Sequence, residues 1–456
     1  MKTKKKSIVD GDNGLVDSDE GSEKTASGFR LAFPVYYLFA LILTNVVNAN
    51  AAASGERMNL FTLPENVRLV AILGEMYPQS ITSDNAGNVY VAGNGEYNPD
   101  RLKLPEKIVG VILEKYDKNG NKKWATSFGS ISGYTIVKEI AADQHGNILM
   151  VGAGTGIPGH NPRNEPQCYV ATFDQNGRHR WSDRFGPKNG NICSAESVAV
   201  NAVGDFVVAG YSLGLLDSNA KLERNTAHGV GFARKYTSSG SLVWQRHFDA
   251  VDAKYTPLHI ALDMSGNAYV TGSIDDQSNI LTGSFLIKLD QNGNKVWEKV
   301  PVKRSDTAIS KCNATDAQGN VYIVGSTSDT VANYINSGGS DIMILKYNSA
   351  GENIWTKMFG SRGNELVNTM RVDQQGQVWL VVNTDGKMTE AYEKVSWDFD
   401  YFIAGFDSEG KMISSQQFGS RSQDIAEGSA VDVEGNLYIV GDYGGKKVML
   451  KVRVNK

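Results

Sequence analysis

The chain has 456 residues, and its 46 Lys and Arg against 50 Asp and Glu give a formal net charge of −4 at pH 7. This balance argues against a general nucleic-acid-binding protein, because such proteins are usually basic. Hydrophobic residues make up 41% of the chain, and its 48 Gly and 19 Tyr suit a turn-rich protein built from β-strands.

The amino terminus differs in composition from the rest of the chain. Residues 1–30 are basic and then acidic, and we expect them to be disordered; an apolar stretch then runs from Leu31 to Val47 and ends near a small-x-small pattern at Ala49-Asn50-Ala51. Residues 31–51 are therefore predicted to be a secretory signal that is cleaved after Ala51. The alternative is an uncleaved signal anchor, although a membrane span usually needs about 20 apolar residues. Both alternatives place residues 52–456 outside the cytoplasm, in the periplasm, at the cell surface or secreted.

A ten-residue phrase, Asp-x-x-Gly-Asn-x-Tyr-(Val/Ile)-x-Gly, occurs seven times from residue 84 onward. The steps between successive copies are 53 to 62 residues, and the copies begin at Asp84, Asp143, Asn201, Asp263, Asp316, Asp373 and Asp432. A near-constant period of this length indicates a repeat architecture.

A second phrase, Asp-x-x-Gly-x-x-x-Trp-x-x-x-Phe-Gly, follows each of the first six copies. The sixth has Ser414 at the Trp position, and the other five have Trp124, Trp181, Trp244, Trp297 and Trp355. Each phrase predicts a β-hairpin, because its glycine follows an Asp turn between short runs rich in Val, Ile, Tyr and Phe. One unit therefore holds four strands, A to D, and four antiparallel strands repeated radially form a β-propeller blade.

The seventh copy lacks the second phrase, because the chain stops soon after it. The segment Val67–Gly74 has the pattern of the missing strand D, with Leu69 at the Trp position and Leu73-Gly74 at the Phe-Gly position. Its pairing with residues 448–454 would close the ring and remove two exposed sheet edges. We therefore predict an all-β fold, a seven-bladed β-propeller over residues 52–456, whose last blade is completed by an N-terminal strand.

Both phrases resemble the bacterial β-propeller repeats of the SBBP type, over nearly everything from about residue 58 to residue 456. The resemblance implies a secreted or surface-exposed protein, and it carries over no catalytic motif.

The chain has three cysteines. Cys168 and Cys193 fall toward one end of the second blade, so a disulfide between them could form in an oxidising compartment; the alternative is three unpaired thiols. Cys312 is expected to be an inert buried thiol. No Cys or His spacing indicates a metal site, and we predict neither a metal nor a cofactor.

The B–C loops are long and all different, whereas the Asp-Gly turns on the opposite face are short and repetitive. Variable loops on a rigid scaffold are where binding usually occurs. We take Tyr97, Tyr334, Tyr392 and Trp397 in these loops as candidate binding residues, although solvated loops would also contain them. The leading prediction is an exported, non-enzymatic scaffold that recognises a protein or a glycan, and no nucleic acid, through its B–C loop face.

The central channel carries the alternative prediction. Five residues before each turn Asp, strand A has Gln79, Lys138, Glu196, Leu258, Lys311, Asn368 and Glu427. A small-molecule enzyme of the lyase or hydrolase type would use Glu139, His259, Lys311 and Arg371 at this mouth. Arg371 replaces the small residue of the other blades, so it is a candidate anion contact or a structural ion pair. A third alternative is a surface adhesion protein held in the membrane by an uncleaved anchor.

Overall fold

The computed structural model describes residues 63–97, 108–130, 133–160, 165–187, 191–216, 229–250, 253–276, 281–302, 309–331, 333–392 and 398–454. These residues belong to one compact unit, Met58–Lys456. The predicted n-region at 1–30 and the predicted signal at 31–51 lie outside the described residues. The described ranges contain no helix whose length and apolar character would let it cross a membrane.

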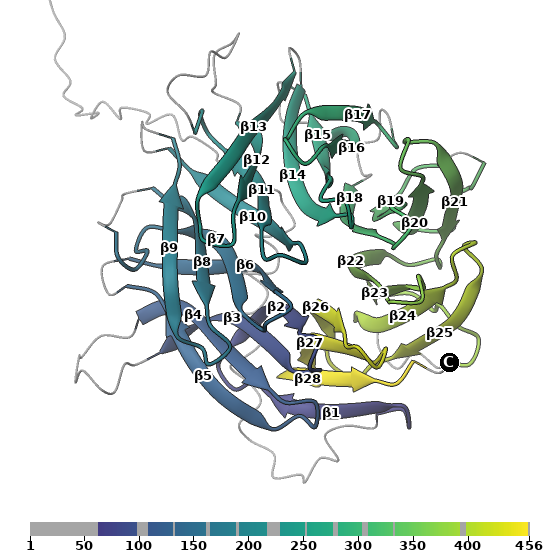
Figure 1. The fold of residues 1–456 in the computed structure, drawn as a ribbon. Coiled ribbons are helices and arrows are strands. Elements are labelled where there is room, and N and C mark those ends of the chain that lie inside the picture. Colours follow the sequence, from purple (N-terminus) through teal and green to yellow (C-terminus); the bar gives the residue numbers. More distant parts are fainter. Residues whose placement is uncertain are drawn as a thin grey trace, which may run out of the picture. The chain divides into compact units, whose positions relative to one another are not determined.

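Among the described residues, twenty-eight strands form seven four-stranded antiparallel blades (Figure 1), as the repeat predicted. Blades 1 to 3 are made of β2 (Tyr77–Ser83), β3 (Val89–Tyr97), β4 (Ile108–Tyr116) and β5 (Lys122–Phe128); β6 (Thr135–Ala142), β7 (Ile148–Gly154), β8 (Gln167–Phe173) and β9 (His179–Phe185); and β10 (Cys193–Val200), β11 (Phe206–Ser212), β12 (Val230–Tyr236) and β13 (Leu242–Ala250). Blades 4 and 5 are made of β14 (Ala253–Leu262), β15 (Ala268–Asp275), β16 (Leu281–Leu289) and β17 (Lys295–Lys299); and β18 (Ile309–Thr315), β19 (Val321–Thr327), β20 (Asp341–Tyr347) and β21 (Asn353–Phe359). Blades 6 and 7 are made of β22 (Glu365–Val372), β23 (Val378–Thr384), β24 (Asp400–Phe406) and β25 (Met412–Phe418); and β26 (Ile425–Val431), β27 (Leu437–Tyr443), β28 (Lys446–Val452) and β1 (Val67–Ile72).

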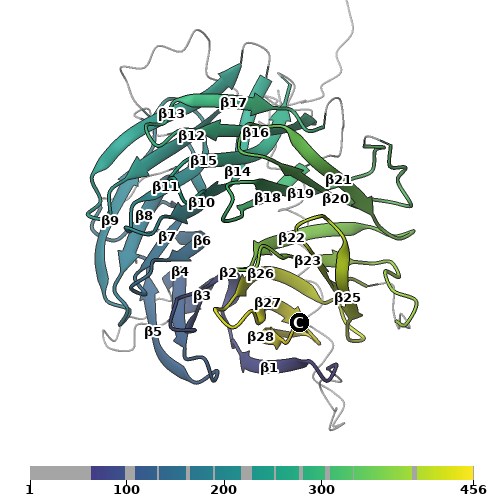
Figure 2. The ribbon, with the colours of Figure 1, turned by 45° about the vertical axis from the view of Figure 1, so that its right-hand side comes forward.

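The first strands of the blades surround the centre of the ring (Figures 1 and 2). Each contacts the first strand of the next blade, from β2 through β6, β10, β14, β18, β22 and β26 and back to β2. In the described part of the chain, side chains between neighbouring blades form the hydrophobic core, in seven clusters. The sheets of blades 3 and 4 are also joined at the rim, because β13 runs on to pair with β14 at Asp249 and Lys254.

Strand β1 closes the ring by pairing antiparallel with β28, which confirms the predicted closure. The predicted register was wrong by one residue at the Trp position. Arg68, not Leu69, lies opposite Lys451. In blades 1, 3, 4 and 5, the residue opposite the corresponding Lys is the Trp of the second phrase. A bulge between Leu69 and Ala71 absorbs the extra residue, and it places Val70 against the turn at Gly120.

The first phrase is explained by the hydrogen bonds of its turn. In blade 1, Oδ1 of Asp84 accepts hydrogen bonds from the backbone N–H groups of Ala86 and Asn88, at 2.9 Å each. Oδ2 accepts from the Asn88 amide at 2.8 Å and from the Tyr90 hydroxyl at 2.9 Å. Gly87 adopts a φ of 78°, which favours glycine. Asp, Gly, Asn and Tyr in the phrase are therefore parts of one turn.

The second phrase is explained by the joints between blades. Nε1 of Trp244 in blade 3 donates to the carbonyl of Gln291 in the C–D turn of blade 4, at 3.0 Å, and Nζ of Lys235 donates to the same carbonyl. The Trp244 ring lies against Gly293 in that turn, so close that a Cβ there would meet the ring at 2.7 Å. The Trp of one blade and the Gly of the next therefore form a single contact.

Candidate functional site

The B–C loops are described only in part. Trp397 lies outside the described residues. Tyr97 is the last residue of strand β3, and its side chain also lies outside the described part of the structure. Tyr334 and Tyr392 lie in two different described loops, after β19 and β23.

The loop between β19 and β20 carries Tyr334 and the most exposed large aliphatic side chain of the B–C loops described. Ile335 is 81% exposed, whereas Tyr334 is half-buried and packs on the core cluster between blades 4 and 5. Sequence reasoning selected Tyr334 and missed Ile335, although an aliphatic residue in a polar loop was a signal that it could have used.

Several hydrogen bonds link the described residues of this loop to one another and to their neighbours. Val331 and Tyr334 exchange backbone hydrogen bonds at 3.2 and 3.0 Å. The Asn336 amide donates to the carbonyls of Thr327 and Gly339, at 3.1 and 3.2 Å. The ends of the loop are also tied down, since the N–H of Ser337 donates to Oδ2 of Asp341 at 2.7 Å and the N–H of Gly339 to the carbonyl of Gly363 at 2.9 Å. Ile335 is thus an exposed apolar side chain on a braced loop.

Tyr392 is turned toward the blade rather than outward. Its hydroxyl is buried, and burial and the charge of Asp400 raise the pKa of Tyr392. The structure therefore brings Tyr392 to the joint between blades 6 and 7, away from Tyr334.

A β-bulge in every blade forms the ring of residues predicted at the channel mouth. The ladder between strands A and B shifts by one residue in all seven blades, and the bulged residues are Gln79, Lys138, Glu196, Leu258, Lys311, Asn368 and Glu427. Bulges redirect side chains and are common beside functional sites. Here the bulge is part of the repeat itself, so it marks a ring rather than one special blade.

The charges of this ring are arranged in pairs. Lys138 and Glu196 form an ion pair at 3.3 Å between blades 2 and 3. Burial raises the pKa of Glu427 to about 7, although the positive charge of Lys311 acts in the opposite direction. The predicted catalytic residue Lys311 therefore interacts with Glu427, across from blade 5 to blade 7.

Glu139 and His259 lie one step deeper in the channel, where the structure brings them together. Nε2 of His259 lies 3.4 Å from Oε1 of Glu139, and its Nδ1 lies 3.1 Å from Oδ1 of Asn313. Oε2 of Glu139 accepts hydrogen bonds from the Ser197 hydroxyl at 2.5 Å and from the N–H of Val198 at 2.9 Å. Burial raises the pKa of Glu139, but His259, Ser197 and the charge of Arg371 outweigh it and hold that pKa below its usual value.

Ser80 and Ser197 occupy in blades 1 and 3 the position that Glu139 has in blade 2. Each serine hydroxyl accepts a hydrogen bond from a backbone N–H of the next blade, from Ile140 and Ile260 respectively. Glu139 therefore joins neighbouring blades as these serines do.

Arg371 lies in strand A of blade 6, half-buried, and donates to the carbonyl of Met370 at 2.8 Å. Its charge acts on Glu139 and on Cys312. Burial raises the pKa of the Cys312 thiol to about 11, as expected of an inert buried thiol.

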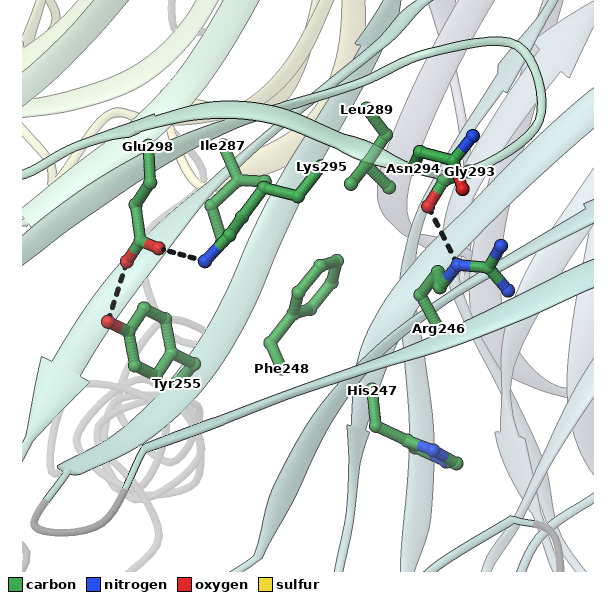
Figure 3. A pocket seen from close by; sticks show the side chains of 10 residues that line it. All are labelled: Arg246, His247, Phe248, Tyr255, Ile287, Leu289, Gly293, Asn294, Lys295 and Glu298. Atoms are coloured by element: carbon green, nitrogen blue, oxygen red, sulfur yellow. Dashed lines mark hydrogen bonds and ion pairs between the residues drawn. The ribbon is translucent and has the colours of Figure 1, made fainter. Parts of the chain in front are cut away.

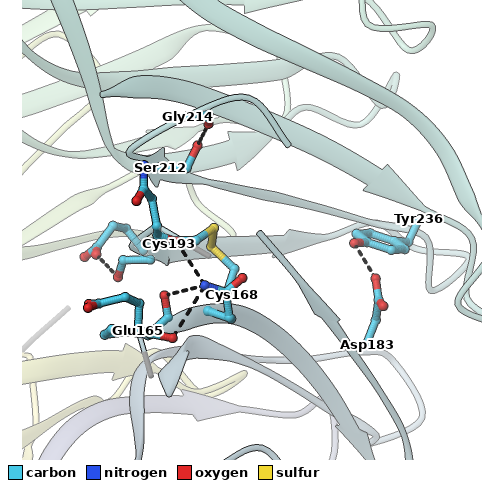
Figure 4. Close-up of a disulfide and its surroundings, with 12 residues drawn as sticks. Glu165, Cys168, Asp183, Cys193, Ser212, Gly214 and Tyr236 are labelled. Atoms are coloured by element: carbon cyan, nitrogen blue, oxygen red, sulfur yellow. Dashed lines mark hydrogen bonds between the residues drawn. A yellow bond between two sulfur atoms is a disulfide. The ribbon is translucent and has the colours of Figure 1, made fainter. Parts of the chain in front are cut away.

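Cys168 and Cys193 form a disulfide between strand C of blade 2 and strand A of blade 3 (Figure 4). Both cysteines are fully buried. The bridge therefore ties two blades together, where the sequence had placed both cysteines near one end of blade 2.

Paired carboxyl groups occupy the corresponding place in two later joints. Counted from the bulge of each blade, Glu365 and Asp424 occupy the position of Cys193, although Asp424 comes one residue before β26. Asp341 and Asp400 occupy the position of Gln167, the neighbour of Cys168. All four acids are 0% or 1% exposed. Burial raises the pKa of Asp424 to about 6, with a further contribution from Asp400.

An open depression of about 380 Å³ lies at the rim, between blades 3 and 4 (Figure 3), and shares no residue with the channel mouth. Phe248 stands in the middle of the view, with Lys295, Glu298 and Tyr255 on one side and Arg246 on the other. Glu298 accepts hydrogen bonds from Tyr255 at 2.7 Å and from Lys295 at 2.8 Å. Over the described ranges, no cluster of three or more His, Cys, Asp or Glu side chains is arranged to hold a metal ion.

Comparison with known proteins agrees with the repeat. Residues 66–96 match the family model described as SBBP, beta-propeller repeat, which confirms the resemblance for that segment. Over 212 residues the chain is 26% identical to an uncharacterized WD repeat-containing protein of Acanthamoeba polyphaga mimivirus, a match that covers 41% of this chain and 15% of the relative. The aligned part of the chain thus spans about 15% of the length of that curated relative.

Two solved β-propeller domains are similar to this structure. The WD40 beta propeller domain of Doa1 has a TM-score of 0.48 at 8% identity, and the match covers 85% of this chain and 97% of that one. The beta-propeller domain of the Trilobed protease from Pyrococcus furiosus has a TM-score of 0.46 at 8% identity, covering 84% and 95%.

Proposed function

We propose that this seven-bladed propeller, which carries an SBBP-type repeat at residues 66–96, is an exported, non-enzymatic scaffold that binds a protein partner through its B–C loop face. Export is supported by the signal-like segment at 31–51 and by the buried disulfide, since disulfides persist in oxidising compartments.

The exposed side chain of Ile335 on its braced loop carries the proposal. An apolar side chain that is held outward by fixed backbone loses little conformational freedom when a partner covers it. Such pre-organised apolar anchors, surrounded by polar groups, are typical of protein interfaces. Asn336 and Ser337 provide the polar surroundings here.

A protein partner fits this surface better than a glycan. Sugar recognition would use exposed aromatic faces and amides, whereas Tyr334 is packed on the core, Tyr392 turns its hydroxyl inward, and the Asn336 amide is occupied by two carbonyls. An aliphatic side chain gains free energy mainly by leaving water, at roughly 25 cal/mol per Å², and that requires an apolar surface on the partner.

The channel mouth supports an enzyme less well. A catalytic acid or base needs a free position toward substrate. Both oxygens of Glu139 and both ring nitrogens of His259 already face partners from other blades.

Site-specific photo-crosslinking tests the proposal. A benzophenone amino acid would replace Ile335 in one variant and Met264 in another, in the exported full-length protein, followed by irradiation in the native envelope. Met264 is a matched control, because it is 86% exposed but lies in an A–B turn on the opposite face. We expect one discrete protein adduct from position 335 and none from position 264.

Ile335→Asp should then abolish co-purification of the cross-linked protein, whereas His259→Ala and Arg371→Ala should leave it unchanged. Equal adducts from both positions, or loss of the partner on changing His259 or Arg371 but not Ile335, would contradict the proposed face.

A further inference from the structure

Arg371 is the large residue in a level of the central channel that is otherwise lined by small side chains. Two residues before the turn Asp or Asn, the first strand of each blade has a residue that pairs with the Tyr position of the first phrase. In blade 6 this residue is Arg371, and in the other blades it is Thr82, Ala141, Ala199, Ala261, Ala314 or Ala430. All of these residues except Ala430 are partly exposed, so water reaches this level of the channel.

The guanidinium of Arg371 has unused hydrogen-bond donors. Its Nη1 donates to the carbonyl of Met370 at 2.8 Å, and no other hydrogen bond or ion pair joins the guanidinium to a described residue. A guanidinium is always charged and carries five N–H donors. Nε and Nη2 are therefore both unused, and side by side they form the planar fork that pairs with two oxygens of a carboxylate or a phosphate.

Positive charge gathers on the side of the channel where Arg371 lies. The charges of Arg371 and Lys311 both act on the thiol of Cys312, so the two cations lie near one another, in blades 6 and 5. Lys311 also acts on Glu427, but burial raises the pKa of that carboxyl to about 7, so Glu427 is only partly charged at neutral pH. The protein therefore balances the positive charge on this side incompletely.

The other carboxylates described at the channel are held by groups of neighbouring blades. Glu196 forms an ion pair with Lys138 at 3.3 Å. Oε1 of Glu139 lies 3.4 Å from Nε2 of His259, and Oε2 accepts two hydrogen bonds from blade 3. Arg371 lowers the pKa of Glu139, but less than His259 does, and no ion pair joins Arg371 to Glu139. Arg371 is therefore a charge that no described carboxylate neutralises by contact.

We propose that the central channel binds a small oxyanion, a carboxylate or a phosphate group, on Nε and Nη2 of Arg371, with Lys311 adding a second positive charge nearby. The small side chains at the level of Arg371 leave room beside the guanidinium, and a partly buried position strengthens a charged hydrogen bond relative to bulk water. Two sources have this chemistry, a phosphate compound and a small carboxylic acid. The site is separate from the loop at Ile335 and does not depend on the proposed function.

Isothermal titration calorimetry of the purified, disulfide-intact protein tests the proposal. The probes are sodium phosphate and sodium succinate, each at constant ionic strength set with sodium chloride, because salt screens charge. Arg371→Ala gives blade 6 the residue that five other blades have, so this variant should fold and lose binding. Arg371→Lys keeps the charge but not the planar fork. Arg421→Ala, which removes an exposed arginine between β25 and β26, is the matched control.

We expect saturable binding of at least one probe by the unaltered protein and by Arg421→Ala, roughly tenfold weaker binding by Arg371→Lys, and none by Arg371→Ala. Binding of phosphate alone would assign the site to phosphate compounds, binding of succinate alone to carboxylic acids, and binding of both to oxyanions in general. If Arg371→Ala fails to fold, Arg371→Gln removes the charge and keeps the length of the side chain. No saturable binding of either probe, or equal binding by the neutral variant, would overturn the proposal.

Discussion

At the scale of single residues, buried acid pairs occupy, in two later joints, the place that the disulfide occupies in the joint between blades 2 and 3. Ser361 and Ser420 each follow a Phe-Gly, and each donates through its backbone N–H and its hydroxyl to the acid four residues later, Glu365 or Asp424. The glycine is required by the other acid, because a Cβ at Gly360 or Gly419 would meet Oδ1 of Asp341 or Asp400 at 2.2 or 1.9 Å. In blade 2 the amide of Gln167 fills this space beside the disulfide.

These acids predict an unusual pH dependence of stability. Burial raises the pKa of Asp424 to about 6 and of Glu427 to about 7 in the folded protein, above their values of 3.8 and 4.5 without the fold. Groups of this kind penalise the folded state at high pH, and the penalty is relieved as pH falls through the folded pKa. The free energy of unfolding should therefore rise between pH 7.5 and pH 5, by on the order of 2 kcal/mol for Asp424. The gain from Asp424 is complete only below its unfolded value of 3.8, and further acid then removes the contribution of Glu139, whose pKa is lowered in the folded protein.

Asp400→Asn checks this assignment, because it removes the charge beside Asp424 and introduces an amide such as Gln167 provides. Denaturant unfolding at pH 8 and pH 5.5 should show a stabilised variant at pH 8 and a smaller difference between the two pH values. Glu409→Gln, an exposed acid in the same blade, is the control and should keep the full difference. An unchanged pH dependence in Asp400→Asn would rule out the Asp400–Asp424 pair as its source.

At the scale of the hairpin, the glycine of an A–B turn and the glycine of a C–D turn are required for different reasons. Gly266, in an A–B turn, has a φ of 78° and no atom within 4 Å of an added Cβ. Gly293, in a C–D turn, has a φ of 79°, and an added Cβ would lie 2.7 Å from the Trp244 ring. The first glycine serves backbone conformation alone, whereas the second also serves contact between blades.

Alanine at these two positions should therefore have different costs. Gly266→Ala should lower the free energy of unfolding by about 1 kcal/mol, the cost of a left-handed conformation for a residue with a Cβ. Gly293→Ala should cost about 2 kcal/mol more, because the Trp244 ring must also move. Equilibrium unfolding in urea measures the free energy of unfolding of both variants. Equal losses in the two variants would show that the Trp244 ring can move without an energetic cost.

At the scale of the whole molecule, ring closure depends on twelve residues near the start of the described chain. Leu63 and Leu69 pack on the last blade's core, and the N–H of Leu73 donates to the carbonyl of Lys447 at 2.8 Å. Without β1, the outer edge of β28 would have unpaired backbone groups, which promote association between chains.

Removal of β1 should weaken the entire ring rather than one blade. A protein that begins at Met76 should melt at a lower temperature than one that begins at Met58, and should self-associate in light scattering. A synthetic peptide of residues 63–74, added in excess, should restore both properties. Equal melting temperatures for the two proteins would show that closure contributes little.

The sequence by itself determined the repeat, the blade count and the strand that closes the ring. It could do so because Asp-x-x-Gly turns and the Trp-Gly contact are local rules repeated in every copy. Its predicted register failed at Leu69, because a bulge is not visible in residue spacing.

Only the tertiary structure decided which residues work together. Glu139 and His259 lie 120 positions apart along the chain. Only the packing of blades 2, 3 and 4 brings Oε1 of Glu139 within 3.4 Å of Nε2 of His259, and it places Oε2 of Glu139 against Ser197 and Val198 of the next blade. The acid pairs and the loop that carries Ile335 likewise depend on contacts between blades. A repeat fixes what each blade has in common, whereas a site arises where neighbouring blades differ, and the side chains that meet there come from distant parts of the chain.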